Sequence, residues 1–363
     1  MIPEDNRFES DPAAALPAAP TLPEGWTATT PDGDDEADVA RLTELLRAHE
    51  RAGRGWASAG GDDVLVEVSE RGLAMRANVV LRDPDGVIHA WGSVHDRAPG
   101  RMLFVHIVSR ELPDEVASRC NAVLLDWADA QARTVGAARG VETQQIDTGA
   151  FDEDLRQQQW LAAAGFTRVR RWWQMSRSVT PDEVELVPDP AHWAREGVVF
   201  RRVRQQGDGM PDEADLRAVH DVLEGAFTDH FNSAEETFDE FIHRLREDPG
   251  HRWDHWWLAE IVDGDGPPEA AGALVGTVNE SPSWPDGSYV AYLGVLESAR
   301  GRGVAKGLLH TIIADAAASG RDRVGLEVDA DSPTGADGLY VSMGWGTKYV
   351  SQSWHRDVRA ATD

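Results

Sequence analysis

One short stretch of this chain places a glycine-rich turn between a strand and a helix. Residues 289–295 form a short apolar run typical of a strand, and apolar residues recur at helical spacing over residues 304–318. N–H groups in the first turn of a helix lack intrahelical partners, and the helix dipole adds partial positive charge there. The turn holds Gly301 and Gly303, which let an anion approach the backbone, and two arginines. The sequence therefore predicts an anion-binding turn.

The residues of the turn distinguish it from two common phosphate-binding motifs. A dinucleotide-binding fingerprint would need glycine where Lys306 stands, and a Walker loop would need Gly-Lys-Ser/Thr before the helix. The pattern Arg300-x-x-Gly303-x-Ala305 instead resembles the coenzyme A pyrophosphate loop of the GNAT acetyltransferase superfamily. The alternative is a plain basic turn.

The resemblance implies acetyl-coenzyme A as cosubstrate, with no metal ion. It implies that Val295 offers backbone groups to the pantetheine arm and that the N–H of Leu293 polarises the acetyl carbonyl, where negative charge grows in the transition state. The residues implied to bind the cofactor are Leu293, Val295, Arg300, Gly301, Arg302, Gly303, Val304 and Ala305.

The resemblance also implies two proton carriers. Tyr340 stands where the family keeps the tyrosine that protonates the leaving thiolate, although a Leu-Tyr pair on a helix is often core packing. Tandem-GNAT proteins of actinobacteria, a group that includes mycothiol synthase and is the nearest resemblance, can use a glutamate on the strand before the turn as base. This chain has no carboxylate there. Glu327 is our candidate base, with Asp329 second; alternatively, Glu327 is a rim carboxylate paired with Arg323.

The acceptor is less well defined by the sequence. Asp229 and His230 could bind a cationic amine, or they could belong to a capped and solvated helix junction. A tryptophan cluster could form a pocket wall or part of the core; its members are Trp253, Trp256, Trp257 and Trp284. Asp331 and Ser332 replace part of a segment where the family often has an asparagine near the cofactor, which puts that contact in doubt.

The leading function is therefore acetyl transfer from acetyl-CoA to a primary amine, with a small-molecule amine as acceptor, directly in a ternary complex. Cys120 is far from the turn in sequence, so no covalent intermediate is expected. The alternatives are a peptide or protein N-terminal acetyltransferase, transfer to a hydroxyl, and a non-catalytic acyl-CoA-binding regulatory module.

A length of 363 residues favours two domains, and the order of predicted elements repeats. We expect an α/β (α+β) fold of two tandem GNAT-type domains, each a mixed, mostly antiparallel sheet flanked by helices. The expected division is a disordered acidic tail at 1–23, a degenerate GNAT-like domain at 24–179, a linker at 180–197 and an active GNAT domain at 198–363. Each half is expected to end in a short strand rich in tryptophan and basic residues.

The expected elements follow from periodicity and turn residues. Helices are expected at 38–52, 114–135, 213–227 and 304–318, and strands at 64–68, 77–81, 87–94, 102–108, 198–203, 253–261, 273–279, 289–295 and 323–329.

The N-terminal half lacks the chemical residues at the matching places. The segment after its fourth expected strand has no Gly-x-Gly, and Glu111, Asp114 and Glu115 would repel a pyrophosphate. Aligning Gly165 with Gly344 puts Leu161 where the tyrosine stands. We expect this half to pack on the other half without catalysing the reaction or binding coenzyme A in the usual way.

Composition limits the partners and the compartment. The formal charge of −28 disfavours nucleic acid and anionic membranes as partners, and it mildly favours cationic substrates. Alternatively, the acidic residues simply form a solvated surface. The sequence contains no apolar run of about 18 residues, so it predicts no membrane span. The single cysteine, Cys120, excludes a disulfide framework and is expected to be a small buried residue. A cytoplasmic monomer or homodimer is expected.

Overall fold

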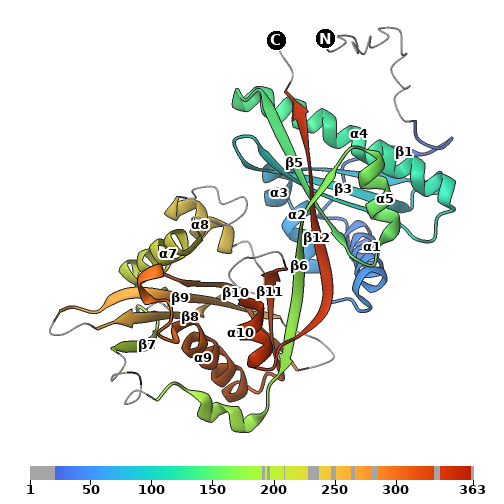
Figure 1. Cartoon of the computed structure of the whole chain (residues 1–363). Helices are drawn as coiled ribbons and strands as arrows, with labels where there is room; N and C mark the ends of the chain where they lie inside the picture. Colours follow the sequence, from blue (N-terminus) through green and yellow to red (C-terminus); the bar gives the residue numbers. More distant parts are fainter. Residues whose placement is uncertain are drawn as a thin grey trace, which may run out of the picture.

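The two halves of the chain share one sheet. The computed structural model describes residues 21–189, 193, 197–207, 209–227, 237–246, 251–262, 266–279, 285–330 and 336–360. Its strands form a 12-stranded sheet in the order β1-β2-β3-β4-β5-β12-β6-β11-β10-β9-β8-β7. The sheet runs from the N-terminal half at the upper right of Figure 1 to the C-terminal half at the lower left.

The halves repeat the same series of elements. The first contains β1 (Thr27–Thr29), α1 (Glu36–Arg54), α2 (Gly61–Val68), α3 (Glu70–Met75), β2 (Arg76–Arg82), β3 (Ile88–Ala98), β4 (Arg101–Val108), α4 (Asp114–Arg139), β5 (Thr143–Phe151), α5 (Leu155–Ala163) and β6 (Thr167–Ser178). A 3-10 helix, η1 (Pro181–Leu186), leads to β7 (Val198–Arg202), α7 (Glu213–Phe227), α8 (Phe238–Arg246), β8 (His251–Ile261), β9 (Glu269–Asn279), β10 (Gly287–Val295), η2 (Glu297–Ala299), α9 (Val304–Ala318), β11 (Arg323–Asp329), α10 (Ala336–Ser342) and β12 (Gly346–Arg359).

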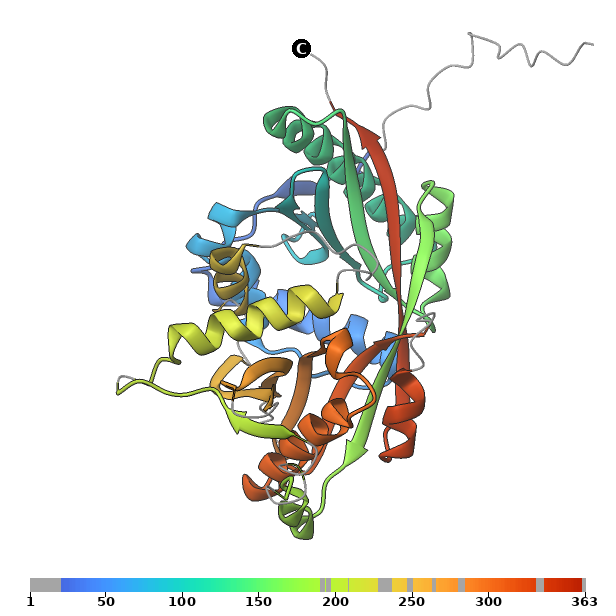
Figure 2. The same cartoon turned by 60° about the vertical axis from the view of Figure 1, so that its left-hand side comes forward.

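The final strand of each half pairs with the other half. Strand β6 pairs with β11 from Arg323–Ser178 to Asp329–Trp172. Strand β12 returns to the N-terminal half, where it lies between β5 and β6 and pairs antiparallel with both. Figures 1 and 2 show these two long strands crossing between the halves. Each half therefore completes its sheet with the last strand of the other.

These final strands differ from the expectation of short local strands. Strands β6 and β12 contain 12 and 14 residues. Both halves end in a strand of similar composition, so local pattern does not say which sheet each strand joins. Tertiary packing decides which strands β6 and β12 pair with, and the strand preferences of single residues predict such pairing poorly.

Four hydrophobic clusters hold the helices on the sheet. In the C-terminal half, α9 covers one face through an apolar stripe of Leu308, Leu309, Ile312 and Ile313, all fully buried. Helices α7 and α8 pack on the other face through a second cluster, which includes Leu216, Val219 and Phe241. In the N-terminal half α4 belongs to the third cluster, and α1 and α2 belong to the fourth. The sheet of each half is therefore flanked by helices on both faces.

Several predicted elements are observed at their predicted bounds, and one prediction is wrong. Helices α7 and α9 and strand β11 coincide with the expectation. Residues 64–68, predicted as a strand, instead belong to α2. Val64, Val66 and Val68 alternate, but only Val64 and Val68, one helical turn apart, are fully buried. The carboxylate of Asp63 also accepts a hydrogen bond from the Gly60 N–H at 2.7 Å, which caps the helix.

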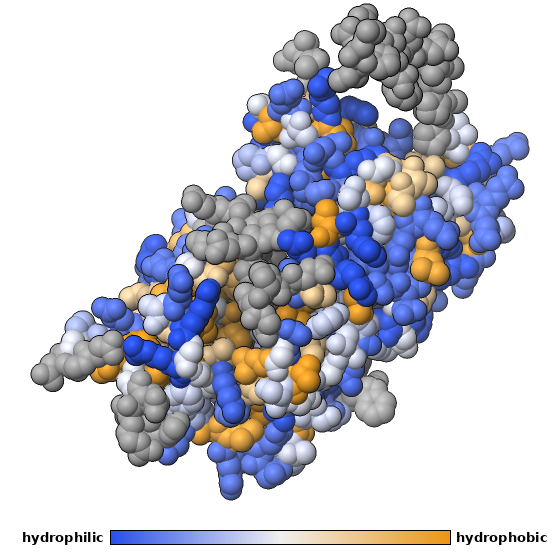
Figure 3. Space-filling view, viewed as in Figure 1, coloured by the Kyte–Doolittle hydropathy of each residue, from blue (hydrophilic) through white to orange (hydrophobic). Residues whose placement is uncertain are grey.

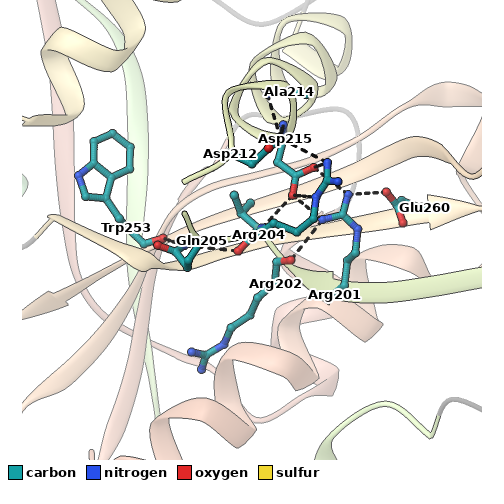
Figure 4. A network of polar contacts seen from close by, with 10 residues as sticks. Arg201, Arg202, Arg204, Gln205, Asp212, Ala214, Asp215, Trp253 and Glu260 are labelled. Atoms are coloured by element: carbon teal, nitrogen blue, oxygen red, sulfur yellow. Dashed lines mark hydrogen bonds and ion pairs between the residues drawn. The ribbon is translucent and has the colours of Figure 1, made fainter. Parts of the chain in front are cut away.

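An ion network fixes the start of α7 against β7 (Figure 4). The Asp212 carboxylate accepts hydrogen bonds from the N–H groups of Ala214 and Asp215 at 3.1 and 3.2 Å, as an N-cap does. The buried Asp215 accepts hydrogen bonds from Arg201 at 2.6 and 3.0 Å and from Arg204 at 2.6 Å. Burial raises the pKa of Asp215, but hydrogen bonds from the two arginines outweigh it and hold that pKa well below its usual range.

Two alternatives raised by the sequence are resolved by burial. Trp256 and Trp257 are 0% and 2% exposed, so they belong to the core rather than to a pocket wall. Trp284 lies outside the described residues. Cys120 lies on the buried face of α4, and burial raises the pKa of its thiol to about 11, which leaves it an inert core residue.

The surface agrees with the acidic composition. In the view of Figure 3 the N-terminal half is largely hydrophilic, whereas hydrophobic residues gather over the C-terminal half. Among the helices that the structure describes, none combines the length and the apolar character needed to span a bilayer.

Candidate functional site

The candidate site begins where β10 and β11 separate. These parallel strands pair from Ser288–Val324 to Val290–Leu326, and an irregularity of β10 follows between Val290 and Tyr292. Beyond it β10 pairs only with β9 as far as Val295. The backbone of β10 that faces β11 is consequently unpaired in this stretch, which contains the half-buried Leu293 and Val295. An extended ligand could pair with it as a strand would.

The predicted turn connects this strand to α9. Gly301 and Gly303 have φ of 80° and 77°, a left-handed conformation that residues with a Cβ rarely adopt. Gly303 is the N-cap of α9, and no side chain caps the helix. The first N–H groups of α9 are therefore available to an anion, as the sequence predicts.

The surroundings of the turn suit a phosphate. Arg300, Gly301, Arg302 and Gly303 are exposed, Ala305 is half-buried, and Val304 is buried in the core at the base of α9. A Cβ on Gly303 would lie 2.9 Å from the Trp193 ring, so only glycine fits without displacing that ring.

Tyr340 lies on α10 in the same hydrophobic cluster as Leu293 and Val295. Its half-buried ring packs edge-on against Trp345, with 6.1 Å between centroids. Burial raises the pKa of Tyr340 to about 12, so the hydroxyl stays protonated at neutral pH. With this pKa the phenol is a weaker acid than a thiol, whose ordinary pKa is about 8.5. It can still donate a hydrogen bond to sulfur.

Glu327 lies on β11, on the face away from α9. Its neighbours Leu326 and Val328 are buried against α9, whereas the side chain of Glu327 is exposed to solvent on the other face. Protein packed around this carboxyl still takes away part of its hydration, which raises its pKa, and a hydrogen bond from the Gln174 amide partly opposes the effect. Its described partner is thus Gln174 rather than Arg323, which pairs with Asp322 at 2.6 Å.

Asp329, the second candidate, has a different environment. Its carboxylate lies 3.4 Å from the Arg170 guanidinium on β6. Asp329 is therefore ion-paired, whereas the described partner of Glu327 is the neutral Gln174 amide.

A row of polar side chains crosses three strands beside Glu327. Gln174 on β6 is in register with Glu327 on one side and with Tyr349 of β12 on the other. The Tyr289 hydroxyl donates to the Gln174 side-chain oxygen at 3.3 Å. A Cβ on Gly325 would lie 2.9 Å from the Tyr289 ring, so this glycine makes room for the ring.

The N-terminal half extends this row. Arg54, near the end of α1, donates to the Tyr349 hydroxyl at 3.2 Å and is ion-paired with Glu50. The exposed Trp56 packs edge-on against Tyr349, with 5.3 Å between centroids. Side chains of both halves therefore surround the approach to the carboxylate. Sequence reasoning missed Gln174, Tyr349 and Arg54, because nothing local links them to Glu327.

Asp229 and His230, the predicted acceptor-binding residues, lie outside the described residues, as do Asp331 and Ser332. In the N-terminal half, α4 follows β4 with Pro113 as N-cap and no side-chain cap. Leu161, at the position that corresponds to Tyr340, is fully buried.

Comparison with known proteins agrees with this geometry. Residues 216–345, which include the separated strands, the turn and Tyr340, match the acetyltransferase (GNAT) family. No curated protein matches the chain.

Solved structures extend the likeness to both halves. A GCN5-related N-acetyltransferase from Sphaerobacter thermophilus has a TM-score of 0.71 and 23% identity, over 94% of this chain and 99% of that chain. A tandem GNAT protein from the clavulanic acid biosynthesis pathway has a TM-score of 0.63 and 16% identity, over 93% of this chain and 100% of that chain. Saccharomyces cerevisiae N-myristoyltransferase with bound myristoyl-CoA has a TM-score of 0.55 and 11% identity, over 92% of this chain and 83% of that chain. The fold is accordingly that of two GNAT-type domains in tandem.

Proposed function

We propose that residues 198–363 form an acetyl-CoA-dependent N-acetyltransferase and that residues 24–179 form a second GNAT-type unit without catalysis, joined by a linker at 180–197. The observation that carries the proposal is the uncapped N-terminus of α9 behind Gly301 and Gly303, next to the unpaired edge of β10. The family match in this region supports the reaction class, and the bound myristoyl-CoA of one solved neighbour supports coenzyme A as carrier.

The residues of the turn fit the charged part of coenzyme A. The first N–H groups of α9 would bind the pyrophosphate, and Arg300 and Arg302 would add positive charge. The backbone of Leu293 and Val295 would pair with the pantetheine arm, and the N–H of Leu293 would stabilise the charge that develops on the acetyl oxygen. Bound acetyl-CoA supplies an activated thioester.

The other groups of the site would move protons during direct transfer to a primary amine. The amine nitrogen forms a bond to the acetyl carbon and the carbon–sulfur bond breaks. Glu327 would accept the proton that the amine loses, since its raised pKa makes it a better base than an ordinary carboxylate. The Tyr340 hydroxyl would donate a hydrogen bond to the departing sulfur. A small-molecule amine is favoured because the protein carries a formal charge of −28, which attracts cations.

The test is thiol release from acetyl-CoA across polyamines, amino sugars, amino acids and short peptides. We expect turnover with at least one small amine, and a loss of about 10²- to 10⁴-fold in kcat for Tyr340→Phe with coenzyme A binding retained. Tight coenzyme A binding without turnover of any acceptor would instead support a non-catalytic acyl-CoA-binding module. Turnover of peptides alone would support N-terminal acetylation.

A further inference from the structure

Tyr289 is linked to Glu327, the proposed base, through the side-chain amide of Gln174. The Tyr289 hydroxyl donates to Oε1 of Gln174 at 3.3 Å, and Nε2 of Gln174 donates to Glu327. These three side chains belong to β10, β6 and β11, which are neighbours in the sheet. Each end of the amide therefore has one described partner, and the two partners lie on different strands.

The ring of Tyr289 reaches Gln174 because β11 has a glycine between them. Strand β11 lies between β10 and β6, and its Gly325 is in register with Tyr289. A Cβ at this glycine would lie 2.9 Å from Cδ2 of the ring, closer than such atoms approach each other. Gly325 does not have a left-handed backbone, so the space that it leaves for the ring is the structural reason for a glycine here.

The hydrogen bonds of this chain run in one direction when Glu327 is ionised. A carboxylate only accepts, so the amide end that faces it must be the nitrogen, which only donates. The amide oxygen of Gln174 then faces Tyr289 and accepts its hydroxyl hydrogen. Burial raises the pKa of Tyr289 well above its usual range, so this hydrogen is present at neutral pH. Donation thus runs from Tyr289 through Gln174 to Glu327.

The reverse direction would suit a protonated Glu327. The carboxyl would then donate to the amide oxygen, and the amide nitrogen would donate to the Tyr289 oxygen. The Tyr289 hydrogen would lose the only acceptor that it has among the described residues. Hydrogen bonds in a chain also polarise one another, so donation by Tyr289 makes the N–H of Gln174 a stronger donor. Both effects favour the ionised carboxylate.

Other titratable or charged groups lie on the elements around Glu327. They are Glu50 and Arg54 of α1, Arg170 of β6, Asp329 of β11 and Tyr349 of β12. Arg54 is ion-paired with Glu50 and donates to the Tyr349 hydroxyl. Arg170 is ion-paired with Asp329. Among the described residues, Gln174 is the hydrogen-bond partner of Glu327.

We propose that Tyr289 is a positioning residue which, through Gln174, keeps an N–H rather than a carbonyl oxygen directed at Glu327. The inference rests on the proposed role of Glu327 as base. A carboxyl that faces an N–H has no acceptor there for its proton, so it returns the proton of the amine to solvent, to which it is exposed. A carboxyl that faces a carbonyl oxygen would retain the proton and would be slower to act again.

The test is the titration of Glu327 in the full chain, measured by NMR with glutamate labelled with carbon-13 at its carboxyl carbon. The signal of Glu327 is identified by its loss in Glu327→Gln. We expect Tyr289→Phe to raise the pKa of Glu327 by about 0.3 unit, a twofold change in acid dissociation, since a bond of 3.3 Å between oxygens is weak. Tyr289→Phe should have no effect in a Gln174→Met background.

A second variant moves the hydroxyl without deleting it. Gly325→Ala should displace the Tyr289 ring and raise the pKa of Glu327 as Tyr289→Phe does. Tyr349→Phe is the matched control, because it deletes a hydroxyl that accepts from Arg54 and has no described bond to Gln174. It should leave the titration unchanged.

Three results would overturn the proposal. One is an unchanged pKa of Glu327 in both Tyr289→Phe and Gly325→Ala. Another is an equal shift by Tyr289→Phe with and without Gln174, which would mean that the hydroxyl acts on the carboxyl directly. The third is a shift of equal size in Tyr349→Phe. Failure of acetyl transfer leaves the experiment intact, because its readout is a titration without turnover. Acetyl transfer by a protein whose Glu327 does not respond to Tyr289 would keep the proposed function and reject the positioning role.

Discussion

Gln174, on a strand of the N-terminal half, donates a hydrogen bond to Glu327, on a strand of the C-terminal half. The exchange of the final strands brings the two residues into register. The proposed base is therefore oriented by a side chain that the family-matched segment does not contain.

Glu327→Gln tests the proposed base. We expect kcat to fall by about 10²- to 10⁴-fold, with little change in coenzyme A binding. In the unaltered protein the rate should fall as the pH falls through the raised pKa of Glu327, because the base must be ionised. Steady-state rates between about pH 4 and pH 8 measure this limb, because that range covers the titration of a carboxyl group. Asp322→Asn, an exposed acid just before β11, is the control. A larger loss in Asp329→Asn than in Glu327→Gln would move the base to Asp329.

Gln174→Met tests the contact between the halves. The Gln174 amide lowers the pKa of Glu327, so removal of that amide should raise the pKa and shift the acidic limb of the rate profile to higher pH. A purely structural role would lower the rate without moving the limb. Ser178→Ala, at the exposed end of the same strand, should leave the profile unchanged.

Arg300→Glu tests the charge of the turn. We expect coenzyme A to bind about tenfold more weakly, a change of about 1.4 kcal/mol. The difference should shrink as salt is added, because the site is exposed. Lys348→Glu makes the same charge change at an exposed site on β12 and should have a much smaller effect. Equal weakening in both variants would mean that only net charge matters.

Asp215→Asn tests the network that fixes α7. Loss of this buried carboxylate removes the acceptor that Arg201 and Arg204 share, although each keeps a second carboxylate, and should lower the free energy of unfolding by roughly 3 kcal/mol at pH 7. The pKa of Asp215 is depressed in the folded state, so its contribution is complete above the unfolded value of about 3.9 and is lost as the pH falls below it. Urea unfolding should therefore show that the free energies of unfolding of the unaltered protein and of Asp215→Asn become more similar in acid. Asp221→Asn, exposed on the same helix, is the control.

The turn and its helix could be predicted from the sequence because each is a local pattern, whereas the role of Tyr340 is implied by the family resemblance and stays a prediction. Residues 304–318 carry a complete helical stripe, and the two glycines are adjacent to it. The pairing of β12 with β5, and with it the contacts of Gln174 and Tyr349, could not be predicted. Strand partners that are distant in sequence depend on packing between whole elements. The valines of α2 predict a strand because valine favours strands and their alternation imitates one, whereas the structure buries Val64 and Val68, which lie one helical turn apart.

The exchanged strands also set an order of synthesis and folding. Strand β12 leaves the ribosome after every strand of the N-terminal half, yet it lies in the interior of the sheet, between β5 and β6. Until it emerges, β5 has an open edge, although every other strand of the N-terminal half has already been made. Long-range pairing of this kind slows folding and leaves an aggregation-prone edge exposed. A nascent chain that stalls just before residue 346 would thus carry its exposed edge in the half that was translated first.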